Sequence, residues 1–313
     1  MLTKWSKILF LLFVGIYLSS KSFYDYFVFD MLVQYSIYAL IIAFFLLIIY
    51  HYSIRKEQKK NVLYLLPIFI IPYIVYQEMG NFYFGDNNKG EESNFKIISI
   101  NIFSQNNDFQ YLREYLSKET SDVLILQELT PAWQKNVEFV RKKYPYYKEE
   151  ARSNNFGIAI YSKIPLDTVI TRKYIDKGHP SLIAQIQVNG KALSILATHP
   201  VPPLPNQARF EKRNKQYQLI KEDIENLSTE NIILMGDLNT TIYSPNFNLL
   251  KSDKMKDARS GFGLVNSWNA FIPLLRTNID QCWVSEPIKV TNFYRGSDIK
   301  SDHFPIVAEL KIE

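Results

Sequence analysis

The chain has 313 residues, enough for one large domain or two small ones, and hydrophobic residues make up 47% of it. Its net charge of +5 is too mild to indicate a nucleic-acid-binding surface by itself. A single cysteine, Cys282, excludes an internal disulfide and a cysteine-based zinc site. The apolar residues are concentrated near the N-terminus, so the chain divides into an apolar region and a globular remainder.

Three apolar segments occupy the N-terminal region. They run from about Trp5 to Ser20, from about Leu32 to Tyr52 and from about Val62 to Tyr76. The second has roughly twenty residues without a charge, enough to span a hydrocarbon core about 30 Å thick. No small-residue cleavage site follows the first, so it is interpreted as a membrane span rather than a signal peptide. About three spans are expected within residues 1–79, with two as the alternative.

Basic residues flank these segments unevenly. Lys4 and Lys7 precede the first segment, and a second group lies between the second and third segments: Arg55, Lys56, Lys59 and Lys60. Because Lys and Arg favour the cytoplasmic side of short loops, both groups are expected in the cytoplasm. Two spans would leave the C-terminal part in the cytoplasm, whereas three would place it outside. The three-span count therefore predicts a multi-pass membrane protein with an extracytoplasmic globular domain.

Residues 80–94 are polar and rich in Gly and Asn, which predicts a linker before a domain over residues 95–313. Helices are expected from Asp108 to Glu119, from Thr130-Pro131 onward, and from Asn206 to Leu227. Strands are expected at residues 95–101, 123–126, 157–161, 181–188, 193–197, 232–235, 279–284, 288–293 and 306–312. This mixed spacing, with strands outnumbering helices, favours an α/β fold of two packed β-sheets with outer helices.

Polar residues stand where these predicted strands begin or end. Strand ends are the usual position of catalytic groups in layered α/β proteins. The residues, in chain order, are Asn101, Gln127-Glu128, Thr198-His199-Pro200, Gly236-Asp237-Leu238-Asn239, Asp280 and Asp302-His303. Carboxylates and an amide converging with a histidine indicate a hard divalent cation and a side chain that contacts phosphate. The pattern therefore predicts a metal-dependent phosphoesterase.

The ordered set of polar sites resembles the endonuclease/exonuclease/phosphatase superfamily over residues 95–313. The chain is most similar to bacterial membrane-anchored members with N-terminal transmembrane helices. Two further runs carry that likeness: Thr198-His199-Pro200-Val201-Pro202-Pro203 and Asp257-Ala258-Arg259-Ser260-Gly261-Phe262-Gly263. The resemblance implies a four-layer α/β sandwich, a location in the bacterial cytoplasmic membrane, and a phosphoesterase that depends on Mg²⁺ or Mn²⁺.

The resemblance also implies roles for individual residues near the cation and the attacking water. Glu128 matches the metal-binding glutamate, with Asn101 and Asp302 near the same ion. A hard cation suits these oxygen donors and leaves positions open for phosphate oxygens. Asp237 and Asn239 match the pair that orients the attacking water and holds the phosphate.

Histidines complete the implied site. His303 matches the histidine that contacts the scissile phosphate, and Asp280 matches the carboxylate that orients it. His199 is a candidate general acid for the leaving oxygen. Gln281 departs from the family, because many relatives have an aromatic residue or His there, and it is expected to contact substrate. Arg213, on the charged helix over residues 206–227, is also predicted to contact substrate.

The substrate is less specified than the chemistry. A nuclease is slightly favoured, with Tyr243, Trp268 and Phe293 as candidate platforms for base stacking. A phospholipid or phosphomonoester hydrolase is the alternative, because a membrane anchor would bring the site close to lipid headgroups. An inactive membrane-tethered binding domain is a third hypothesis, disfavoured because every core polar residue is present. The sequence does not specify an oligomeric state.

Overall fold

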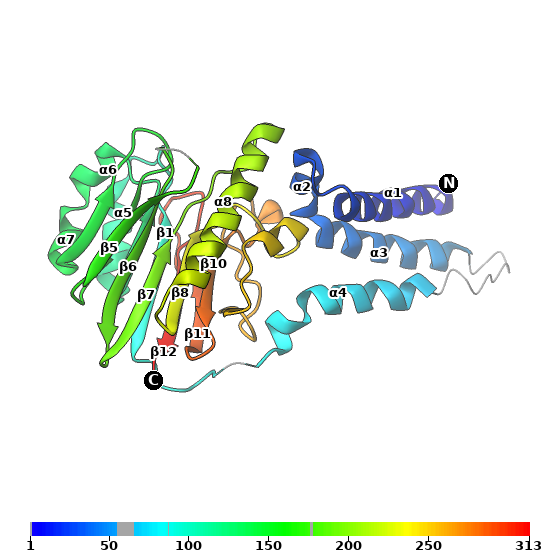
Figure 1. The fold of residues 1–313 in the computed structure, drawn as a ribbon. Helices are drawn as coiled ribbons and strands as arrows, with labels where there is room; N and C mark the ends of the chain where they lie inside the picture. Colours follow the sequence, from blue (N-terminus) through cyan, green and yellow to red (C-terminus); the bar gives the residue numbers. More distant parts are fainter. Residues whose placement is uncertain (1, 55–65, 87, 176–177) are drawn as a thin grey trace.

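Two six-stranded sheets face each other in the part of the chain after residue 94 (Figure 1). The computed structural model describes residues 2–54, 66–86, 88–175 and 178–313. The first sheet has the order β11 (Lys289–Arg295), β12 (Ile306–Lys311), β1 (Phe95–Asn101), β2 (Val123–Gln127), β4 (Ile158–Ser162), β3 (Tyr146–Glu150). The second has the order β5 (Thr168–Lys173), β6 (Pro180–Val188), β7 (Lys191–Ala197), β8 (Asn231–Asp237), β10 (Asp280–Ser285), β9 (Met255–Asp257).

Apolar side chains fill three separate layers between these elements. The central layer joins the two sheets and includes Ile97, Ile195 and Ile306. A second layer packs the first sheet against its helices, α5 (Phe109–Lys118), α6 (Pro131–Asn136) and α7 (Glu138–Lys143). A third packs the second sheet against α8 (Gln207–Asn226). The predicted four-layer sandwich of two mixed sheets with outer helices is therefore confirmed.

The sequence analysis did not predict three of the described strands, and all three lie at sheet edges. Strand β3 ends the first sheet, and β5 and β9 are the two edges of the second. Strands β3 and β5 have no fully buried residue. An edge strand with one solvated face carries little continuous apolar sequence, so its pattern is weak.

Among the described residues, four helices precede the sandwich and project from one end of it (Figure 1). They are α1 (Leu2–Ser22), α2 (Phe27–Val33), α3 (Ser36–Ile54) and α4 (Leu66–Phe84). The basic group at residues 55–60 and the start of the third predicted span, residues 62–65, lie outside the described residues. Helix α4 continues to Phe84, so the first residues of the predicted linker are helical. Within the described part of the chain, α3 is the one helix long and apolar enough to cross a membrane, by length and composition.

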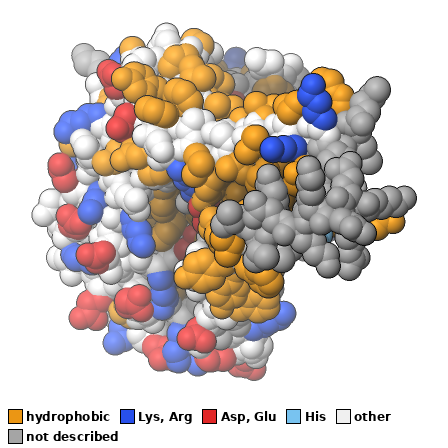
Figure 2. All heavy atoms as spheres, turned by 90° about the vertical axis from the view of Figure 1, so that its right-hand side faces the viewer, with side chains coloured by type: hydrophobic (Ala, Val, Ile, Leu, Met, Phe, Trp, Pro, Cys, Tyr) orange, Lys and Arg blue, Asp and Glu red, His pale blue; other side chains and the backbone are white. Residues whose placement is uncertain are grey.

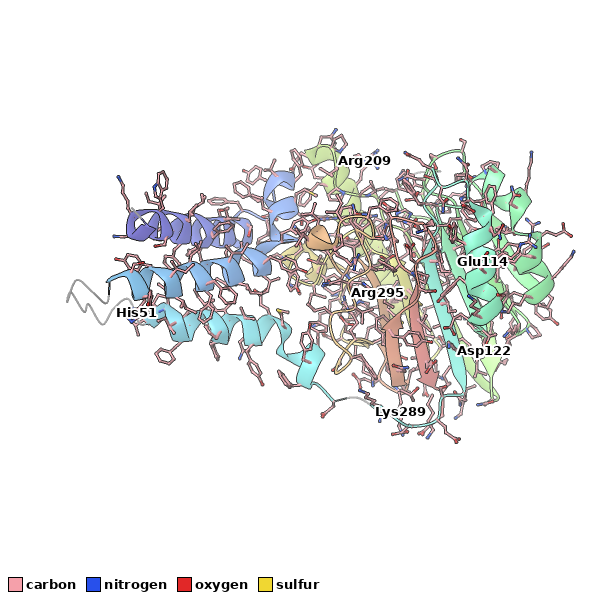
Figure 3. All side chains as sticks on the ribbon, turned by 180° about the vertical axis from the view of Figure 1, so that it is seen from behind. His51, Glu114, Asp122, Arg209, Lys289 and Arg295 are labelled. Atoms are coloured by element: carbon pink, nitrogen blue, oxygen red, sulfur yellow. The ribbon has the colours of Figure 1, made fainter. Side chains whose placement is uncertain are left out.

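Large apolar side chains cover the outside of the projecting helices. Leu11, Phe45 and Phe69 are 56%, 59% and 74% exposed. Figure 2 shows hydrophobic side chains gathered over the helices and charged side chains around them on the sandwich. His51 lies near the end of α3 that points away from the sandwich (Figure 3).

A buried ion pair fixes the helices to the sandwich. Asp30 of α2 accepts from Nη1 of Arg213 in α8 at 2.8 Å, and both side chains are fully buried. The other carboxylate oxygen of Asp30 accepts from Ser244 Oγ at 2.8 Å and from Asn246 Nδ2 at 3.0 Å. A buried charge is tolerated when it is paired and fully hydrogen-bonded, which is the case here. Helix α2 therefore docks through its one acidic side chain.

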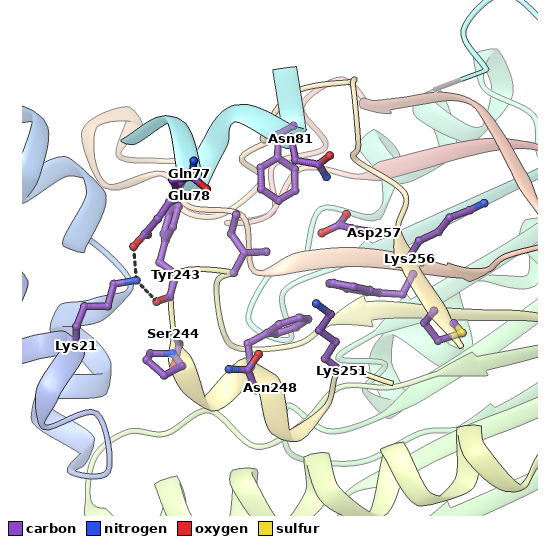
Figure 4. A pocket seen from close by; sticks show the side chains of 16 residues that line it. Lys21, Gln77, Glu78, Asn81, Tyr243, Ser244, Asn248, Lys251, Lys256 and Asp257 are labelled. Carbon is purple, nitrogen blue, oxygen red and sulfur yellow. Dashed lines mark hydrogen bonds and ion pairs between the residues drawn. The ribbon is translucent and has the colours of Figure 1, made fainter. Parts of the chain in front are cut away.

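A second contact lies between α1, α4 and the sandwich. Lys21 pairs with Glu78 at 2.7 Å and donates to the backbone oxygen of Tyr243 at 2.9 Å (Figure 4). A cavity of about 610 Å³ opens beside this contact. Asp257 in its lining pairs with Arg259 and Lys256 pairs with Glu286, and Lys251 also lines it. The cavity lies at the joint between the helices and the sandwich.

Replacing one member of the buried pair is expected to destabilise the protein strongly. Arg213→Met leaves the Asp30 carboxylate buried without its cation and should lower the free energy of unfolding by about 3–5 kcal/mol. The matched control is Lys142→Met, which removes an exposed pair with Glu138 and should cost about 0–1 kcal/mol. Thermal unfolding of the full chain in detergent measures both. Equal shifts of the midpoint in the two variants would contradict this account of the joint.

Candidate active site

The strand register brings the predicted polar residues to one edge of the sandwich. Strands β1 and β2 are parallel, with Asn101 opposite Gln127, so Glu128 follows directly at the same edge. Strand β10 is antiparallel to β8 and starts with Asp280 opposite Asp237. Parallel strands end together, and an antiparallel neighbour begins where they end. The edge therefore collects side chains that are far apart in the sequence.

Backbone constraints hold the loop after β8. A Cβ atom on Gly236 would lie 2.0 Å from the backbone oxygen of Thr198, so only glycine fits between these strands. The backbone N–H of Asn239 donates to Asp237 Oδ1 at 2.9 Å, and its side-chain Nδ2 donates to Pro200 O at 2.8 Å. Asp237 and Asn239 are thus locked against the turn that carries His199.

His303 and Asp280 form a buried pair. His303 Nδ1 lies 2.8 Å from Asp280 Oδ2, which also accepts from Ser267 Oγ at 2.5 Å. Burial opposes protonation of His303, but Asp280 and Asp237 outweigh it and raise its pKa to about 10. The ring is therefore cationic at neutral pH. Its Nε2 points towards Asp237 Oδ2, 3.7 Å away. Ser267, which the sequence analysis missed, has no motif that marks it.

His199 and Asp237 form a second buried pair. His199 Nε2 lies 3.4 Å from Asp237 Oδ2. Burial disfavours the charged ring, yet the hydrogen bond and charge of Asp237 raise the pKa of His199. Burial likewise opposes ionisation of Asp237, but His303 and His199 lower the pKa of that carboxyl. His199 Nδ1 is buried without a hydrogen-bond partner, so the pocket leaves a polar atom free for a ligand.

Glu128 and Asp302 provide the oxygen atoms that a hard cation prefers. Glu128 adopts φ +64, an unusual angle for a residue with a side chain, and accepts from the backbone of Ser104 at 2.7 Å. Asp302 Oδ2 accepts from Trp268 Nε1 at 3.1 Å, whereas its Oδ1 is buried without a hydrogen-bond partner. Burial raises the pKa of Asp302, because no full partner offsets the desolvation. An orphaned carboxylate oxygen beside Glu128 in one pocket fits a bound Mg²⁺ or Mn²⁺.

Asn101 is oriented differently from the other predicted ligands. Its Oδ1 accepts from the backbone of Phe103, which turns Nδ2 towards Glu128 and Asp237, each 3.2 Å away. An amide nitrogen donates hydrogen bonds and does not ligate a hard cation. Asn101 therefore fits better as a bridge between the two carboxylates than as a metal ligand.

A second group of potential metal ligands lies close by. One ligand atom from each of Asp237, Asp280 and His303 falls within 4.8 Å of the others. However, Asp280 and His303 already hydrogen-bond to each other at 2.8 Å, whereas Asp302 Oδ1 has no hydrogen-bond partner. Glu128 and Asp302 are therefore the better site for a hard cation.

The two predicted substrate contacts have other positions. Arg213 is fully buried, where it pairs with Asp30 and donates to Asn239 O at 3.3 Å. Gln281 is also fully buried; it accepts from Arg259 and donates to the backbone oxygen of Thr240 at 2.7 Å. Both support the loop behind the site instead of facing the pocket. The sequence pattern indicated their proximity to the site but not their direction.

The three candidate stacking platforms also differ in position. Tyr243 and Phe293 are each 2% exposed and belong to packed apolar clusters. Trp268 lies in the pocket and is held by its bond to Asp302. Of the three, Trp268 is placed to meet a ligand.

The pocket itself combines the sandwich with the N-terminal helices. Its volume is about 190 Å³, and its polar wall holds the side chains of Glu128, His199, Asp237, Asn239, Asp302 and His303. Met31, Gln34 and Tyr35, from the α2–α3 junction, and Leu204 form part of the remaining wall. Gln34 Oε1 also accepts from the backbone of Thr241 at 2.6 Å. The sequence analysis did not predict this wall, because the contacts join segments that are distant in the chain.

Comparisons with known proteins agree with this geometry. The model of the Endonuclease/Exonuclease/phosphatase family matches residues 98–303. A search of curated protein sequences found no match.

Three solved structures illustrate the likeness in fold. TDP2 from D. rerio, crystallised with a single-strand DNA product, has a TM-score of 0.59 and 20% identity, over 69% of this chain and 98% of its own. Sphingomyelinase C from Streptomyces griseocarneus has a TM-score of 0.53 and 17% identity, over 70% and 99%. An endonuclease/exonuclease/phosphatase from Bacteroides vulgatus has a TM-score of 0.57 and 18% identity, over 71% and 100%. The family match spans most of the chain and includes the strands that carry the site, so this protein belongs to the endonuclease/exonuclease/phosphatase family of phosphoester hydrolases.

Proposed function

We propose that the chain is a membrane-anchored phosphodiesterase that depends on a divalent cation. The observation that carries this proposal is that two buried histidines, paired with Asp237 and Asp280, share one pocket with the carboxylates of Glu128 and Asp302. The histidine pairs would bind the phosphodiester and protonate its leaving oxygen, and Glu128 and Asp302 would hold the cation. Mg²⁺ or Mn²⁺ bound there would stabilise the negative charge that develops on the phosphate.

The side chains divide the reaction between them. Asp237 orients the attacking water, and cationic His303 stabilises the anionic transition state, with Asp280 holding its ring. His199 gives a proton to the leaving oxygen. The water oxygen bonds to phosphorus and one phosphorus–oxygen ester bond breaks. The leaving oxygen receives a proton, so one diester and one water give a monoester and an alcohol. Asn239 and Asn101 hold Asp237 in position.

The N-terminal helices support the membrane part of the proposal. Helix α3 meets the length and composition of a span, and α1 and α4 pack beside it with exposed apolar side chains. With α1, α3 and α4 as three spans, the bias of basic residues would favour a catalytic domain outside the cytoplasm. A cytoplasmic membrane location with an extracytoplasmic domain is therefore part of the proposal.

Nucleic acid and lipid headgroups are both candidate substrates. Nucleic acid is favoured by Trp268, an aromatic ring beside the phosphate-binding groups. Lipid is favoured by the apolar helices, which hold the pocket next to a bilayer. A binding role without catalysis is disfavoured, because the polar groups assigned to hydrolysis either line the pocket or contact a residue that does.

Removing a proposed metal ligand should weaken metal binding. Glu128→Gln keeps the size of the side chain but removes its charge, and should lower the affinity for Mn²⁺ by about tenfold or more. Isothermal titration calorimetry measures this without an activity assay. The matched control is Glu114→Gln on the outer helix α5, where the carboxylate is exposed (Figure 3). Unchanged Mn²⁺ affinity in Glu128→Gln would rule out Glu128 as a ligand.

Removing the residue that orients the water should abolish hydrolysis. Asp237→Asn should lower the rate of Mg²⁺-dependent hydrolysis of bis(p-nitrophenyl) phosphate by about 10²–10⁴-fold. EDTA should have the same effect on the unaltered chain. Asp253→Asn, at an exposed position in the turn before β9, is the control and should keep its activity. If Asp237→Asn hydrolysed the ester as fast as Asp253→Asn, the proposed role would be wrong.

A further inference from the structure

The pocket opens beside an exposed apolar loop. Phe271, Ile272, Leu274 and Leu275 are 58%, 47%, 92% and 46% exposed, on the segment around η4 (Pro273–Leu275). We call residues 271–275 the rim loop. Water-soluble proteins seldom present consecutive large apolar side chains in this way, so the rim loop is built to meet an apolar surface.

Hydrogen bonds hold the backbone of the rim loop in one conformation. Asn269 Oδ1 accepts from the backbone N–H of Phe271 at 2.9 Å and of Ile272 at 3.1 Å. Ala270 N donates to Asp302 O at 2.7 Å, which joins the loop to the proposed metal ligand. Arg276 donates to the backbone oxygens of both Asn269 and Ala270. The exposed side chains are thus held at a fixed distance from the catalytic groups.

The start of helix α3 is in contact with the end of the rim loop. Tyr35 OH, just before α3, donates to Leu275 O at 3.4 Å, and Tyr38 OH, in its first turn, donates to Arg276 O at 3.1 Å. In Figure 1 the segment around η4, in orange, lies beside α2 and the start of α3. If α3 crosses a bilayer, the rim loop lies at the surface from which α3 emerges.

Helix α2 has the polarity of an element that lies on a bilayer. It buries its acidic residue, Asp30, and exposes the apolar Val28 and Leu32 at 51% and 39%. A helix facing water shows the opposite arrangement, with polar residues outside. Tyr26, directly before it, is 62% exposed. Helix α2 and the rim loop therefore present apolar side chains on either side of the pocket.

Charge at the rim suits the same surface. The guanidinium groups of Arg276 and Arg295 both stack on the ring of Phe304, at 4.8 and 4.3 Å from its centre. Within the described residues, neither guanidinium forms an ion pair. Two cations without acidic partners beside an apolar loop complement the phosphate layer of a membrane.

We infer that the substrate is a membrane lipid phosphodiester that enters the pocket from the bilayer, between the α2–α3 junction and the rim loop. This inference rests on the proposed phosphodiesterase activity and names its substrate class. The phosphate reaches His199, Asp237 and His303, while Met31, Tyr35 and Leu204 contact the apolar part of the lipid. The N-terminal helices then form one wall of the site as well as an anchor.

The test uses the full chain reconstituted with Mg²⁺ in vesicles of phosphatidylglycerol, phosphatidylethanolamine and sphingomyelin. Products are followed by mass spectrometry, and bis(p-nitrophenyl) phosphate and single-stranded DNA are offered to the same preparation. We expect hydrolysis of vesicle lipid. The double variant Phe271→Ser/Leu274→Ser should lower the ratio of vesicle to soluble-ester activity by about tenfold or more, because two apolar anchors are lost.

Ile170→Ser is the matched control, since Ile170 is 47% exposed on the edge strand β5 and should leave that ratio unchanged. Hydrolysis of the soluble ester without hydrolysis of vesicle lipid, with or without cleavage of DNA, would overturn the inference and leave the proposed activity standing. Equal ratios in the double variant and in Ile170→Ser would also overturn it. Failure to hydrolyse the soluble ester, the DNA and the lipid alike would overturn the proposed activity itself.

Discussion

The gathering of negative charge at one edge of the sandwich is the constraint on which the site depends. The carboxylates there are Glu128, Asp237, Asp280 and Asp302. Carboxylates in a poorly solvated place must be paired or protonated. His303 compensates Asp280, and His199 compensates Asp237. The basic group nearest to Asp302 is His303, 4.0 Å away and already shared, and Glu128 has no ion pair within the described residues. A divalent cation held between these two carboxylates would complete the balance of charge, and its own charge would polarise a bound phosphate.

The N-terminal helices and the catalytic sandwich form one structure. The buried Asp30–Arg213 pair lies directly behind the loop of Asn239, so the contact that docks α2 also supports the catalytic loop. Gln34 adds a bond to the backbone of the same loop. An anchor that only tethered the enzyme would need no such contacts. The architecture instead links the position of the helices to the shape of the pocket.

Much of this could be predicted from the sequence, for identifiable reasons. Continuous apolar runs predicted the buried strands, and polar residues at their ends predicted the catalytic edge, since both signals are local. The directions in which the Arg213 and Gln281 side chains point could not be predicted from the local sequence. They depend on distant partners such as Asp30, which is 183 positions away from Arg213. Edge strands β3, β5 and β9 lacked a buried face to mark them. The pocket wall at Met31 was not predicted either, because it too depends on contacts between distant segments. Asp30, an acidic residue in an apolar segment, could nevertheless have indicated a buried contact.

Glu128 and Asp302 are the proposed ligands of the cation. Anomalous X-ray scattering from crystals of the full chain soaked in Mn²⁺ would locate the ion without any assay. We expect one strong peak about 2.1 Å from an oxygen of each of these carboxylates, with Asp302 Oδ1 as a ligand. A peak among Asp237, Asp280 and His303 instead, with Glu128 and Asp302 unligated, would overturn this assignment.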